Sequence, residues 1–100
     1  MKPAKLRPLA EEDLVNAAAY YAQEGERIFD TALAALRRIQ RMPALGSPRM
    51  GQLCEIAGLR SWRVTGFPLQ WLYFETEDHL NVVRLLGDRQ DIAAILSAGD

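Results

Sequence analysis

The chain has 100 residues, of which 49% are hydrophobic and 25% charged, and its net charge at pH 7 is −1. That length suits one small domain, 1–100, and that composition excludes an intrinsically disordered chain. No apolar run approaches the roughly 18 residues of a membrane span, no apolar segment near the amino terminus suggests a signal peptide, and Cys54 is the single cysteine. We therefore expect a soluble, cytoplasmic protein with no internal disulfide, metal or cofactor.

The first segment with partial alternation of apolar and polar residues is 5–9, and its proline predicts an edge strand. Pro8 and the acidic run 11–13 then fit the start of a helix, because carboxylates are favourable at the positive end of the helix dipole. Apolar residues at helical spacing extend this first predicted helix over about 10–23.

Gly25 interrupts the helical pattern, and a second apolar stripe then covers 28–39, before Pro43. Its last turn carries three arginines, which are favourable at the negative end of the helix dipole: Arg37, Arg38 and Arg41. Because only a few residues around Gly25 join the two helices, we expect an antiparallel helical hairpin.

The remainder begins with a proline- and glycine-rich loop, 43–58, after which the apolar period changes to two. Three strands are predicted at 59–65, 69–75 and 80–86, and the short turns between them indicate an antiparallel meander. A terminal helix of at most two turns follows at 91–96. The order β-αα-βββ-α predicts an α+β domain with the helical hairpin packed on a mainly antiparallel sheet.

The central predicted strand carries large apolar side chains on both faces, with Trp71 and Tyr73 on one face and Leu72 and Phe74 on the other. The helical hairpin can cover one face, and the terminal helix is too small to hide all of the second. An exposed apolar patch of this kind usually marks an interface. We therefore expect a partner chain to lay a helix or strand on the second face.

Arginine outnumbers lysine ten to two, and the segment 37–74 carries six arginines against one acidic residue. Such a block suits an acidic partner, because the guanidinium is a planar fork for carboxylate or phosphate. Strand alternation predicts Arg60 and Arg84 on one face of the sheet and Arg63 on the other. Internal ion pairing and a functional patch remain equally compatible with these three residues.

Beside these patterns, residues along almost the whole chain resemble the ParE toxins of the RelE/ParE superfamily. The resemblance rests on a collinear set rather than one motif: Ala10-Glu11-Glu12-Asp13-Leu14, Tyr20-Tyr21, Phe29, Pro43, Gly46, Leu59-Arg60, Val64, Phe67-Pro68, Tyr73 and Val83-Arg84-Leu85-Leu86. It implies a RelE-like fold, a type II toxin–antitoxin (plasmid stabilization) system, a ParD-like antitoxin whose C-terminal segment wraps the toxin in a heterotetramer or larger assembly, and inhibition of DNA gyrase.

The family pattern after Arg84 usually has a histidine and then arginine-aspartate, whereas this chain has Gly87 and Gln90-Asp91. These departures fall where toxicity determinants are expected, and Arg89 substitutes in part. The predicted toxicity or target-binding residues are Arg60, Arg63, Arg84 and Arg89. The predicted antitoxin-binding residues are Tyr20, Trp62, Trp71, Tyr73 and Phe74; core packing is the alternative for the last four.

Two other functions remain open: an mRNA interferase of the RelE kind, and a degenerate toxin that only binds its antitoxin and aids operon autoregulation. The interferase reaction needs groups for proton transfer as well as cations. The sole histidine, His79, falls in a polar turn, and beyond residue 90 there is no histidine, tyrosine, lysine or arginine. We therefore expect no catalytic residue. We also expect no sequence-specific nucleic-acid binding and no membrane partner.

Overall fold

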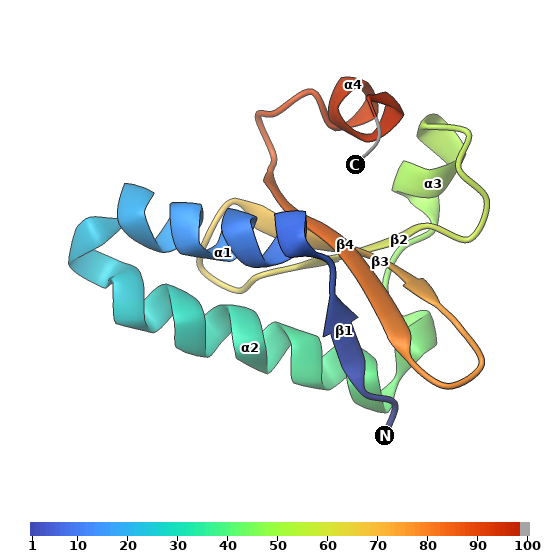
Figure 1. Cartoon of the computed structure of the whole chain (residues 1–100), viewed down its shortest axis with the longest axis horizontal. Coiled ribbons are helices and arrows are strands. Elements are labelled where there is room, and N and C mark those ends of the chain that lie inside the picture. The colour runs from blue at the N-terminus through green and yellow to red at the C-terminus, as the bar shows by residue number, and fades with distance from the viewer. Residues whose placement is uncertain (99–100) are drawn as a thin grey trace.

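The predicted order of elements is confirmed in a computed structural model of the chain, which describes residues 1–98 (Figure 1). The four strands are β1 (Ala4–Leu6), β2 (Arg60–Arg63), β3 (Leu69–Glu75) and β4 (Leu80–Gly87). The α-helices are α1 (Pro8–Tyr20), α2 (Gly25–Arg41), α3 (Arg49–Leu53) and α4 (Ile92–Ser97). Single turns of 3₁₀-helix are η1 (Ala22–Glu24) and η2 (Pro43–Leu45).

The strands form one mixed sheet in the order β1-β4-β3-β2. β2, β3 and β4 are the predicted antiparallel meander, and β1 lies parallel to β4 at the edge. The outer edge of β2 is partly closed by the preceding loop, because Ser47 and Ser61 exchange backbone hydrogen bonds of 2.9 and 3.0 Å. Covering an edge in this way limits pairing with other chains.

Most element boundaries lie one to three residues from their predicted positions. The first strand ends at Leu6 and the helix already begins at Pro8, because proline is well suited to the first position of a helix. Gly25 begins α2 instead of lying in the link, and a Cβ there would lie 3.3 Å from the carbonyl oxygen of Ala18. The predicted loop 43–58 contains η2 and α3.

The helical hairpin of α1 and α2 covers one face of the sheet. Trp71 and Tyr73 of β3 are fully buried there, together with Ile28 and Ile39 of α2. The indole N–H of Trp71 donates a 3.0 Å hydrogen bond to the carbonyl oxygen of Ala32, so this side chain satisfies its only donor inside the core. This face is the main core of the domain.

The opposite face of the sheet has a smaller apolar cluster under α3 and α4, which lie on the other side from the hairpin (Figure 1). Its buried members are Leu59, Leu72, Val83, Leu86 and Ile92. Phe74 from β3 and Ile95 from α4 are only partly buried at its border. The chain therefore covers most of its second face, and the border at Phe74 and α4 stays partly exposed, so the uncovered apolar area is smaller than the sequence predicted.

Candidate functional site

A groove of about 320 Å³ opens where the second face is incompletely covered. It is lined by residues of β3, β4 and α4 and of the segments that precede α1 and β2: Arg7, Ile56, Leu59, Phe74, Val83, Arg84, Ile95 and Leu96. Six of the eight are apolar, and the two charged ones are arginines. Of the lining residues, only Phe74 and Arg84 are among the binding residues predicted from the sequence.

Arg84 is clamped by an acidic residue of α1. Its Nε and Nη2 donate to the two carboxylate oxygens of Asp13 at 2.7 and 2.9 Å, and the backbone N–H of Leu85 donates to the same carboxylate at 3.0 Å. Both side chains are mostly buried, with 18% of Arg84 and 13% of Asp13 exposed. The sequence suggested only a helix-dipole role for Asp13, whereas the structure makes it the residue that fixes the Arg84 guanidinium.

The prediction that Arg60 and Arg84 share one face of the sheet is wrong, whereas Arg63 lies on the opposite face from Arg60, as predicted. Arg60 pairs across the sheet with Tyr73, on the hairpin side, while Arg84 pairs with Leu72 and so lies on the groove side. The cause is a β-bulge between Leu72 and Tyr73, where Val83 of β4 is the extra residue and reverses the alternation. Sequence parity alone cannot reveal such a bulge.

Arg63 and Arg60 are also held by the fold. Arg63 makes two hydrogen bonds of 3.0 and 2.7 Å to the carboxylate of Asp88, which hold the pKa of Arg63 above its usual value. Arg60 donates at 2.6 Å to the carbonyl oxygen of Gly46. Arg89, in the link between β4 and α4, is exposed.

The residues that depart from the ParE pattern close the link between β4 and α4. The backbone N–H of Gly87 donates to Oε1 of Gln90 at 2.6 Å, and Asp91 accepts a 3.1 Å hydrogen bond from the backbone of Ala94. Asp91 thus caps α4. These departures therefore have a local structural role in positioning α4 over the groove.

Two of the predicted antitoxin-binding residues must be corrected. Trp71 and Tyr73 are 0% exposed, and a side chain with no accessible surface cannot contact a partner. The Tyr73 hydroxyl donates to the carbonyl oxygen of Pro43 at 2.7 Å and accepts from the backbone N–H of Gly46 at 3.0 Å. Burial raises the pKa of Tyr73. Both residues are core, the alternative that the sequence left open.

The other predicted contact residues remain accessible. Trp62 is half-buried beside the main core, with the guanidinium of Arg38 5.5 Å from its ring centroid. Tyr20 is 81% exposed at the end of α1 and packs edge-on against Tyr21 at 4.9 Å. A second cavity, of about 570 Å³, is lined by both Tyr20 and Arg89. The structure thus brings together two residues that the sequence assigned to different partners.

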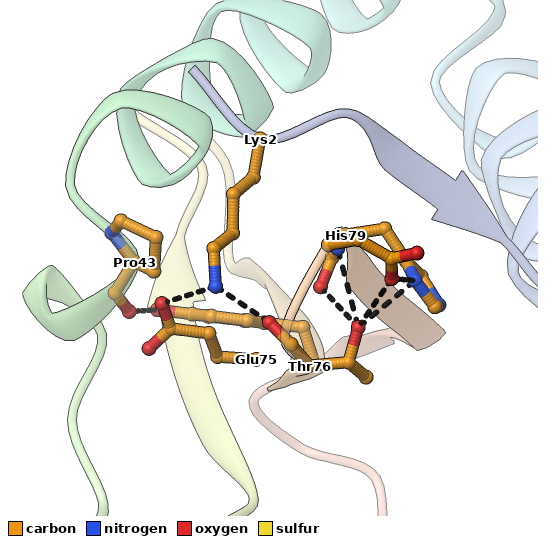
Figure 2. A network of polar contacts seen from close by, with 7 residues as sticks. Lys2, Pro43, Glu75, Thr76 and His79 are labelled. Atoms are coloured by element: carbon orange, nitrogen blue, oxygen red, sulfur yellow. Dashed lines mark hydrogen bonds and ion pairs between the residues drawn. The ribbon is translucent and has the colours of Figure 1, made fainter.

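His79 lies in the turn between β3 and β4, as predicted, and its ring contacts neighbouring polar side chains of this turn (Figure 2). Its Nδ1 lies 2.9 Å from the Thr76 hydroxyl and 2.7 Å from a carboxylate oxygen of Asp78. The hydrogen bond from His79 lowers the pKa of Asp78. Lys2 joins this region by ion pairing with Glu75 at 2.9 Å and donating to the carbonyl oxygen of Thr76.

Residues 1–98 contain neither a candidate metal site nor a candidate membrane span. No cluster of three or more potential metal-ligating side chains occurs there. None of the helices in that range is both long and apolar enough to cross a bilayer. Every buried side-chain nitrogen or oxygen in this part of the chain has a hydrogen-bond partner.

Tyr73→Phe is expected to lower the free energy of unfolding by about 1–3 kcal/mol, because the Gly46 N–H would be left buried without its acceptor. The raised pKa of Tyr73 stabilises the fold below pH 10, and that contribution is lost as pH rises through the folded-state pKa. Urea denaturation at pH 7 and at alkaline pH measures both effects. The variant should show the smaller alkaline loss; an equal loss in both proteins would contradict this assignment.

No protein-family model matches the chain, and no curated protein matches it by sequence. Among solved structures, it is similar to one described as "Chromosomal ParDE TA system from P. aeruginosa". The TM-score is 0.70 at 16% sequence identity, and the match covers 87% of this chain and 96% of that chain. The predicted α+β, ParE/RelE-like fold is therefore confirmed.

Proposed function

We propose that the chain is the toxin of a type II toxin–antitoxin system, neutralised by a ParD-like antitoxin and acting on DNA gyrase. The observation that carries the proposal is the similarity in fold to a ParDE structure over 87% of the chain. The collinear ParE-like residues of the sequence support the same assignment. The incompletely covered second face gives the protein a surface for a partner.

In this proposal the toxin acts by binding gyrase and catalyses no reaction itself. A toxin that prefers gyrase in the state with cleaved DNA shifts the enzyme toward that state, and this needs only a difference in affinity. Of the predicted target-binding arginines, Arg60, Arg63 and Arg84 have hydrogen bonds within the fold. Arg89 is exposed, so we assign the target contact first to Arg89.

A gyrase cleavage assay tests the proposal. Purified protein mixed with gyrase, supercoiled DNA and ATP is expected to accumulate cleaved DNA. Arg89→Ala is expected to reduce that accumulation at least about tenfold, as for loss of roughly 1.4 kcal/mol of binding. The matched control is Arg37→Ala, an exposed arginine on α2, which should behave as the parent protein.

Two results would replace the proposal with one of the alternatives. Cleavage of ribosome-bound mRNA, without accumulation of cleaved DNA, would identify an mRNA interferase. Inactivity in both assays together with tight antitoxin binding would identify a degenerate toxin. If Arg89→Ala is as active as the parent, gyrase inhibition stands and the assignment of Arg89 is wrong.

A further inference from the structure

We infer that two copies of this chain associate through the exposed side of α2, with the two helices antiparallel and related by a two-fold axis. This contact is additional to the antitoxin and gyrase contacts of the proposed function, because its partner is the chain itself. Six exposed residues of α2 form the surface, which we call the α2 face: Glu26, Phe29, Asp30, Leu33, Arg37 and Arg41.

The pitch of the helix gathers these six side chains on one side of α2. At about 100° per residue, all of them fall within about 120° of the helix circumference. The buried residues of α2, which include Ile28 and Ile39, are centred about 140° away and pack in the main core. The α2 face is therefore directed away from the sheet.

The apolar part of the α2 face is Phe29 and Leu33. These residues are one helical turn apart, and 37% and 39% of their surface is exposed. On α1, the neighbouring helix of the hairpin, Val15 is 58% exposed (Figure 1). Covering apolar surface is favourable by roughly 25 cal/mol for each Å², so a second copy on the hairpin gains free energy from these side chains.

The charges of the α2 face are separated along the helix. Glu26 and Asp30 lie in its N-terminal half and Arg37 and Arg41 in its C-terminal half, so like charges are four residues apart and repel within the helix. Within residues 1–98, none of these four side chains has an ion-pair partner. The helix dipole accounts for Glu26 and Arg41, in the first and last turns, whereas Asp30 and Arg37 lie outside those turns.

The opposite charges are arranged symmetrically about one point of the helix. The midpoint between Glu26 and Arg41 and the midpoint between Asp30 and Arg37 coincide directly after Leu33. A two-fold axis at this point places Glu26 opposite the partner's Arg41 and Asp30 opposite the partner's Arg37. Because a two-fold interface is isologous, each ion pair forms twice. The α2 face is thus complementary in charge to itself.

The size of the hairpin limits the strength of the dimer. With 17 residues, α2 is about 26 Å long, and two helices packed about 10 Å apart are about 20 Å wide. Each copy can therefore bury about 500 Å², which in total reaches the lower bound for a specific interface. We expect a reversible dimer with a dissociation constant in roughly the micromolar range. At submicromolar concentrations the chain is then monomeric, and Arg37 stays exposed in a gyrase assay run at those concentrations.

Sedimentation equilibrium of the full chain tests the inference. The parent should change from monomer to dimer as its concentration rises, and added salt should weaken the dimer. Asp30→Arg and Arg37→Glu are each expected to weaken it at least about tenfold, which corresponds to about 1.4 kcal/mol, because each change replaces attraction by repulsion across the axis.

Exchanging the charges separates contact between copies from effects within one helix. The double variant Asp30→Arg/Arg37→Glu should recover most of the parent affinity, because opposite charges again meet across the axis. A mixture of the two single variants should form a heterodimer that is tighter than either homodimer, since one variant has two arginines where the other has two carboxylates. Charge effects confined to one helix predict neither recovery.

Two charge reversals outside the hairpin are matched controls. Arg49→Glu, at the start of α3, and Glu55→Arg, in the segment between α3 and β2, change exposed residues and alter the net charge as the two single variants do. Both should dimerise within about twofold of the parent. Circular dichroism confirms that every variant is folded.

Three results would overturn the inference. The first is a parent that stays monomeric at every concentration, and the second is a dimer that both single reversals leave unchanged. The third is a monomeric parent whose binding to the candidate antitoxin, the ParD-like protein encoded next to this chain's gene, is weakened by the single reversals; that result would assign the α2 face to the antitoxin. All three leave the gyrase assay as an independent test of the proposed function.

Discussion

Asp13→Ala is expected to lower the free energy of unfolding by about 3 kcal/mol. The substitution removes both oxygens that accept from the mostly buried Arg84 and the acceptor of the Leu85 N–H, and breaking a buried pair from one side is strongly destabilising. Urea denaturation followed by circular dichroism measures the change. For a domain of this size, the melting temperature should fall by more than about 10 °C.

The neighbouring acidic residue supplies the control. Glu12→Ala removes an exposed carboxylate from the same turn of α1 and should cost less than about 0.5 kcal/mol. The double variant Asp13→Ala/Arg84→Met should be more stable than Asp13→Ala alone, because it removes the charge that Asp13 compensates. Strictly additive losses in this cycle would mean that the pair is not coupled.

Trp71→Ala is expected to have the largest effect of any substitution on β3, about 3–5 kcal/mol. The side chain has no accessible surface, so its removal leaves a cavity in the main core and eliminates the hydrogen bond to Ala32. Thermal denaturation should show a lower melting temperature than that of the parent, or no cooperative transition. Trp62→Ala, which removes a half-buried indole from the neighbouring strand, is the comparison.

The comparison of Trp71→Ala with Trp62→Ala also shows which of these aromatic residues can contact a partner. If Trp71→Ala costs much more stability than Trp62→Ala, Trp71 is a core residue and its loss affects any binding only through folding. Equal and small losses would contradict the burial of Trp71. The conservative variant Trp71→Phe should remain folded and bind the candidate antitoxin as the parent does.

The four arginines predicted to bind the target differ in their contacts within the fold. Arg84 and Arg63 each form a pair of hydrogen bonds with a carboxylate, and Arg60 donates to backbone carbonyl oxygens. Loss of the mostly buried Arg84 therefore affects folding as well as binding, whereas Arg63 is 64% exposed and its ion pair contributes little to stability. Exposed Arg89 is the cleaner probe of target binding, since a surface substitution usually changes stability by less than about 0.5 kcal/mol.

The sequence by itself determined the order of the four strands and of α1, α2 and α4, but it missed α3. Its apolar period changes from helical to alternating after the loop 43–58, and the bounds predicted for the central strand agree with β3. Local patterns also indicated that β3 is apolar on both faces, which identified the second face as incompletely covered. Period and turn chemistry are local properties, so neighbouring residues suffice to reveal them.

Only the tertiary structure decided which side chains meet. Asp13 and Arg84 are 71 residues apart and pair because α1 packs on β4, and the bulge at Val83 places Arg84 on the groove side. Arg7, Ile56 and Ile95 enter the same groove from three separate segments. A pattern within one element fixes its faces, but contacts between elements depend on register and packing, which no local pattern encodes.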